Sequence, residues 1–230
     1  MLQSSSPFIK HLIATDPLPP PQPALYEYVM AGNGIFLRAQ RKELTACIPL
    51  IDTTIHGLPE VTPSLSLAGP RIPETIIADI LTHSLTAWAD PTGPKEALFH
   101  CEFDADWSLS IPEQIRTAIS VRCADPFTPS YATCLVEIHS HHEMPPLFST
   151  TDNQDETGFR IFGVLGHFGR EPQILFRIGI YGHFFCIPAE SIAELPQGIR
   201  DGFLALHDKE TLSGDVDGLL DEDVDHNPAL

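Results

Sequence analysis

The segment Thr133-Cys-Leu-Val-Glu-Ile-His139-Ser-His141 is followed, after seven residues, by Ser149-Thr-Thr-Asp152. Residues 133–139 come after proline and serine breakers and are rich in β-branched and apolar types, a pattern that favours a strand. Side chains two positions apart on a strand share a face. His139 and His141 therefore point to one side of the predicted strand, while Ser140 and His142 point to the other.

Two neutral imidazoles that converge on one point suit zinc, which binds nitrogen at about 2.0–2.1 Å. Ser149 with an acid three residues later is typical of a helix start, so a short helix over about 150–158 would turn Asp152 back towards the histidines. Each piece alone has a structural reading, as a hydrogen-bonded strand histidine or a helix cap, but their joint occurrence favours a metal site. Three protein ligands leave a fourth position for water, as in catalytic Zn²⁺ sites.

This spacing resembles the JAMM signature of the JAB/MPN-domain metallopeptidases, in their prokaryotic branch. The family pattern is an upstream Glu, then His-x-His-Pro, then seven residues to a Ser and an Asp three further on. His139, His141, Ser149 and Asp152 meet it, whereas His142 stands where the family usually has Pro. Over residues 70–195 the resemblance implies an α+β fold, a mixed β-sheet flanked by helices with the α/β/α layering of cytidine deaminases.

The family's Glu follows a first helix and opens a strand. Residues 71–88 carry a helical stripe of apolar residues with Pro73 near the start, and a strand is expected over Lys95–Cys101, so Glu96 is the preferred candidate. Its rivals are Glu137, which shares the strand face of the histidines, and three acids that alternate along the next stretch and are typical of a solvated face. Those three are Glu102, Asp104 and Asp106.

The roles follow from this arrangement. Glu96 would take the proton of a water and pass it to the leaving amine, and the Ser149 hydroxyl would donate to the oxyanion. His142 is expected at the rim of the site. The resemblance implies a zinc isopeptidase or peptidase that cuts after the C-terminus of a ubiquitin-like protein. Two alternatives are an inactive MPN-like scaffold and a hydrolase of a small amide-bearing metabolite.

Residues 1–70 are predicted to form a separate β-rich module behind a proline-rich leader, Asp16–Pro23. Its strands are expected at Tyr26–Met30, Ile35–Arg38 and Leu44–Ile51, as a meander. The metallopeptidase-like domain is expected over 71–200, and its later strands over 159–167, 173–181 and 182–187. Residues 201–230 are predicted to be an acidic, disordered tail; the acids at 214–225 do not match a full EF-hand loop.

The composition limits the partners. The chain of 230 residues has 31 acids and 13 bases, a formal charge of −18, which argues against direct nucleic-acid binding. We find no apolar run that could span a membrane and no cationic signal peptide, so a cytoplasmic location is expected. Five scattered cysteines without a C-x-x-C motif predict buried free thiols.

The arrangement of a proline-containing β module, a JAB-like domain and an acidic end is also similar to the protein A family of the bacterial PRTRC cassette. That gene cluster, on plasmids or integrative elements, encodes ThiF-like (E1-like) and E2-like proteins. The resemblance implies that these proteins are partners, and that a ubiquitin-like protein or its conjugate is the substrate.

Overall fold

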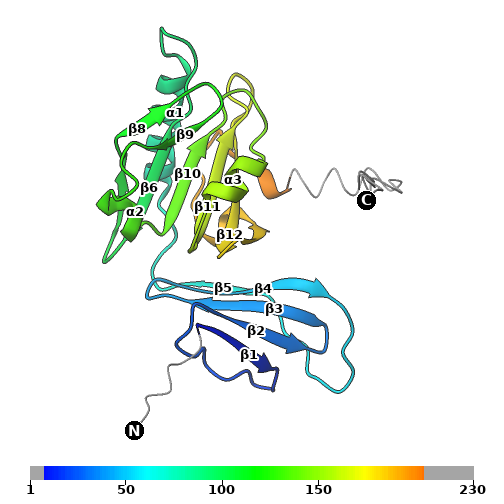
Figure 1. Cartoon of the computed structure of the whole chain (residues 1–230). Coiled ribbons are helices and arrows are strands. Elements are labelled where there is room, and N and C mark those ends of the chain that lie inside the picture. Colours follow the sequence, from blue (N-terminus) through cyan, green and yellow to red (C-terminus); the bar gives the residue numbers. More distant parts are fainter. Residues whose placement is uncertain (1–7, 205–230) are drawn as a thin grey trace, which may run out of the picture.

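The computed structural model describes residues 8–204, which form an α+β fold on two β-sheets (Figure 1). The strands of the first sheet lie within residues 9–67, and those of the second within residues 98–201. Helix α1 (Glu74–Trp88) connects them and matches the helix predicted over 71–88. The predicted α+β class is confirmed, and the other helical elements that lie wholly within residues 8–204 are short: α2 (Pro129–Thr133), α3 (Thr150–Asp155) and the 3-10 turn η1 (Ala189–Ser191).

The first sheet contains the predicted meander and two strands that the sequence did not reveal. Its strands, in spatial and chain order, are β1 (Ile9–Ile13), β2 (Tyr26–Ala31), β3 (Gly34–Gln40), β4 (Leu44–Asp52) and β5 (Ser64–Leu67). β1 runs parallel to β2, so the proline-rich segment between them is the crossover of a parallel pair. Arg38 of β3 holds this segment against the sheet, because it donates a hydrogen bond to the Pro19 carbonyl oxygen and forms an ion pair with buried Glu27 of β2.

The second sheet has the order β13-β12-β11-β10-β6-β7, with β14 beside β12. The bounds are β6 (Leu98–Phe103), β7 (Trp107–Ser110), β10 (Val136–Ser140), β11 (Phe159–Gly166), β12 (Gln173–Ile180), β13 (His183–Ile187) and β14 (Arg200–Asp201). A separate hairpin, β8 (Gln114–Arg116) with β9 (Val121–Cys123), follows β7. The strands predicted at 159–167, 173–181 and 182–187 are confirmed within a residue or two.

The two faces of the second sheet differ in chemistry, because successive side chains on a strand alternate between them. On one face, Phe99, Ile138 and Ile161 share a buried apolar core with Ile77 and Ile80 of α1. The other face carries the ionisable residues of the strands and lies under α3 (Figure 1). Among its ionisable residues are His100, Glu137, His139, Arg160 and Arg177.

Several sequence-based expectations can be compared directly with the described residues. All five cysteines are free; Cys47, Cys101 and Cys134 are buried, and Cys123 and Cys186 are half-buried. None of the helices within residues 8–204 has the length and hydropathy needed to cross a bilayer. The ordered sheet reaches Asp201, one residue into the segment predicted as a tail. The predicted acidic stretch at 214–225 lies outside the described residues.

Candidate metal centre

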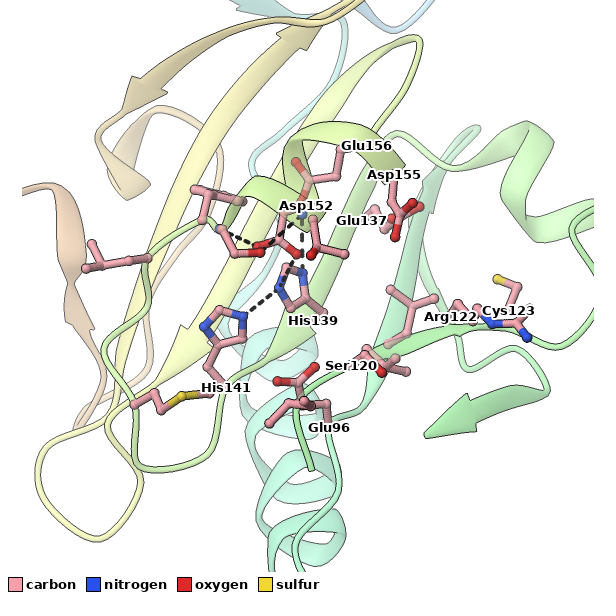
Figure 2. Close-up of a pocket in the computed structure, with 18 of the residues that line it drawn as sticks. Glu96, Ser120, Arg122, Cys123, Glu137, His139, His141, Asp152, Asp155 and Glu156 are labelled. Carbon is pink, nitrogen blue, oxygen red and sulfur yellow. Dashed lines mark hydrogen bonds and ion pairs between the residues drawn. The ribbon is translucent and has the colours of Figure 1, made fainter. Parts of the chain in front are cut away.

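The two histidines of the His-x-His motif lie at the end of β10, in the middle of the second sheet. β10 pairs in parallel with β11 and in antiparallel fashion with β6, so neighbouring strands hold its backbone on both sides. The Ser140 hydroxyl accepts a hydrogen bond from the Ala97 backbone N–H instead of joining the histidines. The alternation expected for a strand thus brings His139 and His141 to the same side (Figure 2).

The side chains of His139, His141 and Asp152 converge with the spacing of a metal site. The two Nε2 atoms are 3.0 Å apart, and Asp152 Oδ1 lies 3.4 Å from His139 Nε2. Two nitrogen ligands of a tetrahedral zinc ion, each about 2.0–2.1 Å from it, are about 3.3–3.4 Å apart. The ligand atoms of all three residues lie within 4.8 Å of one another. The set therefore fits a tetrahedral ion with one position open.

Asp152 reaches the histidines because it closes the first turn of α3. Ser149 is the N-cap of this helix, and its Oγ accepts from the Asp152 backbone N–H at 3.2 Å. In return, the Ser149 backbone N–H donates to Asp152 Oδ2 at 2.5 Å. Only Oδ1 then faces His139. The predicted capping box is confirmed, although α3 ends at Asp155, earlier than expected.

Both histidines are in the protonation state that a metal needs. Burial lowers the pKa of His139 to about 4, against the opposing effect of the Asp152 carboxylate. Burial also lowers the pKa of His141, and Asp152 again acts in the opposite direction. Neutral imidazole is the form of histidine that ligates metal ions. At neutral pH these two residues therefore do not have to lose a proton before binding.

Glu96 lies in the same cavity with its carboxylate towards His141 (Figure 2). The sequence predicted that Glu96 opens a strand, and the structure shows that it does not. Its backbone N–H bonds to Thr117, and that of Ala97 bonds to the Ser140 side chain, so the ladder begins only at Leu98. Burial, together with the negative charge of Asp152, raises the pKa of Glu96 to about 7. Such a value suits a group that accepts and returns a proton near neutral pH.

The other candidates for the upstream acid have different partners. Glu102 accepts hydrogen bonds from the hydroxyls of Ser110 and Thr133. Asp104 forms an exposed pair with Lys42, and Asp106 is exposed. None of these three acids lines the cavity. Glu137 does line it, on the face of His139 as expected, but beside His100 and Arg160.

His142 is buried and is not among the residues that line the cavity, so the prediction that it lies at the rim is wrong. Its backbone has a φ of 52°, in the left-handed region. The Phe168 backbone N–H donates a hydrogen bond to the His142 carbonyl oxygen at 2.7 Å. This bond holds the turn against the segment that follows β11. His142 does not belong to the ligand group of His139, His141 and Asp152.

The cavity in which these residues lie has a volume of about 660 Å³, a size typical of a ligand site. One wall is α3, and the opposite wall is the segment Ile119–Cys123 at the end of the β8–β9 hairpin. Exposed apolar side chains stand at its mouth, namely Ile119, Met144 and Leu147. The cavity is thus open enough for a chain segment to enter from solvent.

Two residues beside the ligand group were not identified from the sequence. Glu156, at the C-cap of α3, has Oε1 4.0 Å from His139 Nδ1, and Arg177 on β12 holds its other oxygen at 2.5 Å. Burial raises the pKa of Glu156, and the Arg177 charge opposes that rise. Acids four apart lie on one helix face, and a lone arginine in the apolar run of β12 indicates a buried partner. Those two signals could have revealed the pair.

Comparison with known proteins adds no identification. No protein-family model matches the chain, and no curated protein matches its sequence.

Proposed function

We propose that this chain is a zinc-dependent peptidase of the JAMM type, which hydrolyses the amide bond after the C-terminus of a ubiquitin-like protein or processes its precursor. One observation carries the proposal. His139, His141 and Asp152 present three ligand atoms within 4.8 Å of one another, and the Glu96 carboxylate faces the same point from the segment before β6. Three ligands and a nearby base are the elements of a hydrolytic zinc site.

The residues of the chain have defined roles in this reaction. A bound zinc ion would lower the pKa of a water from 15.7 to about 7 and polarise the scissile carbonyl. Glu96 takes the proton of the attacking water and delivers it to the leaving amine. Ser149 Oγ already accepts from the Asp152 N–H, so its own proton is free to donate to the oxyanion. Glu156 orients His139 through Nδ1.

The surroundings of the site support a peptide substrate. β9 pairs on one side with β8, and no second strand pairs with it within residues 8–204. An extended tail can add to such an edge through backbone hydrogen bonds, while pockets select its side chains. The apolar groups at the cavity mouth, among them Ile119 and Leu147, suit the aliphatic residues of such a tail. A small metabolite would use little of this surface.

The topology also supports the JAB/MPN-like reading of the second sheet. Its ligands come from a central strand and from the helix that follows it, with a long helix on the opposite face. The proposal extends to the setting implied by the resemblance, a bacterial PRTRC-like cassette whose E1-like and E2-like proteins act on the same modifier. The N-terminal sheet and the acidic end have no assigned part in the reaction.

The test combines metal analysis with a cleavage assay on the full chain. Substrates would be ubiquitin-like proteins encoded near its gene, each fused through its C-terminus to a reporter. We expect the wild-type chain to release the reporter, and Glu96→Gln to retain the zinc bound by His139, His141 and Asp152 without cleaving. Glu102→Gln, an equal change outside the cavity, should cleave normally. Equal activity of Glu96→Gln and wild type would refute the assignment, and a zinc-loaded wild type inert on every fusion would support a scaffold.

A further inference from the structure

A second group of ligand-type side chains lies beside the first on the same face of the sheet. Glu137 precedes His139 by two residues on β10, and His100 is its direct partner across the β6–β10 ladder. His100 Nε2 is 3.6 Å from Glu137 Oε2. The ligand atoms of His100, Glu137 and Cys134 lie within 4.8 Å of one another. None of the three has a role in the proposed hydrolysis.

One carboxylate oxygen of this group has no hydrogen-bond partner in the described part of the chain. Glu137 Oε2 is buried and has no hydrogen-bond partner among residues 8–204. Buried polar atoms without a partner are rare, and a bound ion is one of the explanations for such an atom. His100 Nδ1 lies 2.9 Å from Ser130 Oγ, and when this nitrogen carries the proton it donates to that hydroxyl. Nε2 then carries a lone pair that lies between Glu137 Oε2 and Cys123 Sγ, as in metal-ligating histidines whose other nitrogen is hydrogen-bonded.

A fourth donor reaches the group from the hairpin. Cys123 Sγ, at the end of β9, is 3.8 Å from His100 Nε2. In a tetrahedral zinc site, with bonds of about 2.3 Å to sulfur and 2.0–2.1 Å to nitrogen, the sulfur and nitrogen ligands are about 3.5–3.6 Å apart. The observed distance of 3.8 Å is slightly longer, so Cys123 Sγ and His100 Nε2 would move closer together when they bind an ion. Cys123 and Glu137 both line the cavity, so an ion can enter from there.

The neighbouring charge is compatible with a cation. Arg160 Nη1 is 3.5 Å from Glu137 Oε2, and its Nε and Nη1 are buried without hydrogen-bond partners in the described chain. Two thiolates and a carboxylate together bring more negative charge than a divalent ion removes. The Arg160 guanidinium, which stacks over the Tyr131 ring at 4.3 Å, balances the remainder. Burial raises the pKa of the Cys123 and Cys134 thiols, and the Arg160 charge opposes that rise.

We propose that His100, Cys134 and Glu137, joined by Cys123, bind a second zinc ion. The two ligand groups share no residue, because His100, Cys134 and Glu137 form one group, and His139, His141 and Asp152 form the other. The second ion is therefore separate from the catalytic one, and the inference goes beyond the proposed function and stands without it.

Because Cys123 lies on the hairpin, the second ion would affect how the hairpin is held in place. β9 belongs to a two-stranded hairpin whose partner strand is β8, and its residues form one wall of the cavity. A bond from Cys123 to the ion would tie that wall to β6 and β10. The ion would thus fix the hairpin that faces α3 across the cavity.

Cobalt titration of the full chain tests this site directly. Cobalt bound by thiolate gives a charge-transfer band in the near ultraviolet, and the group of His139, His141 and Asp152 contains no sulfur. Metal-free wild type should bind two equivalents of Co²⁺, one of which produces the band. His139→Ala should lose one equivalent and keep the band. The measurement on wild type requires no substitution, so a variant that misfolds leaves the test intact.

Variants locate the thiolates. The double variant Cys123→Ala/Cys134→Ala should lose the charge-transfer band and still bind one equivalent of Co²⁺. His100→Gln should weaken the Co²⁺ affinity of the site that produces the band. Cys186→Ala removes a half-buried thiol on β13 and should leave the band unchanged. A single equivalent without a band in wild type would overturn the proposal. A band that survives in the double variant would overturn it as well, and neither result bears on the catalytic site.

Discussion

Asp152 and Ser149 hold each other by reciprocal hydrogen bonds, and only one Asp152 oxygen is used in doing so. The Ser149 N–H occupies Oδ2, while Oδ1 stands 3.4 Å from His139 Nε2. The first turn of α3 therefore serves two purposes, because the bond that caps the helix also orients the carboxylate as a ligand. Metal binding and helix capping can be separated experimentally, since they depend on different atoms of the same side chain.

Asp152→Asn should keep the helix and lose the metal. An amide oxygen still accepts from the Ser149 N–H, but the neutral side chain is a poor zinc ligand. Substitution of groups behind the ligands costs about 10–100-fold in affinity, and loss of a ligand should exceed about 100-fold. Chelator competition measures this, with Asp155→Asn on the same helix as control. Unchanged affinity of Asp152→Asn would remove this residue from the site.

Ser149→Ala should impair turnover far more than folding. Loss of the cap costs about 1 kcal/mol of stability, whereas loss of an oxyanion donor costs about 10²–10³ in kcat. Kinetics on a reporter fusion and thermal unfolding measure the two effects. Thr150→Ala, an exposed hydroxyl at the next position, should change neither. An equally active Ser149→Ala would restrict Ser149 to capping.

The parts of the site that the sequence predicted are local in the chain. The strand alternation of His139 and His141 and the cap formed by Ser149 and Asp152 depend on residues within one element. Glu156 and Arg177 escaped prediction because their pairing joins α3 to β12, which only the folded sheet brings together. The same holds for His100 and Glu137, which meet through cross-strand register.

The fold was predictable to a similar extent and for the same reason. The meander β2–β4 and the strands β11–β13 have turn signals and regular apolar patterns in the sequence. β5 lies in a segment rich in proline and serine and exists because β4 offers it an edge. β1 pairs in parallel with β2 across a proline-rich crossover, a non-local contact without a sequence signature.

Glu156→Gln should weaken first-site zinc binding without removing it. Glu156 Oε1 lies 4.0 Å from His139 Nδ1, where a carboxylate raises the basicity of the ligand and fixes its ring. We expect about a 10–100-fold loss of affinity, measured by chelator competition. Glu143→Gln, an exposed acid on the nearby loop, is the matched control. An unaltered affinity would show that Glu156 serves only Arg177.

Arg177→Met should destabilise the fold, because Glu156 would lose its partner while remaining buried. Breaking a buried pair from one side costs about 3–5 kcal/mol, and removing both charges recovers part of that loss. Urea unfolding of Arg177→Met and of Glu156→Gln/Arg177→Met measures the difference. Lys42→Met, which breaks the exposed pair with Asp104, should have no measurable effect. A double variant no more stable than Arg177→Met would contradict this account.

His142→Pro introduces the residue that the JAMM pattern usually has, and here it should be harmful. His142 has a φ of 52°, whereas the proline ring holds φ near −65°. Proline also restricts the residue before it, which is the ligand His141. The turn that follows β10 would have to rearrange, and the hydrogen bond from the Phe168 N–H to the carbonyl of residue 142 would be lost. Melting temperature and first-site zinc affinity should therefore fall together.

His142→Gly separates the backbone requirement from the side chain. Glycine adopts positive φ without strain, so this variant should keep zinc affinity near the wild-type value and lose only the packing of the buried ring. If His142→Pro instead matched wild type in both measurements, the turn could adopt the conformation typical of the family. The left-handed backbone at position 142 would then not be needed to place His141 beside His139.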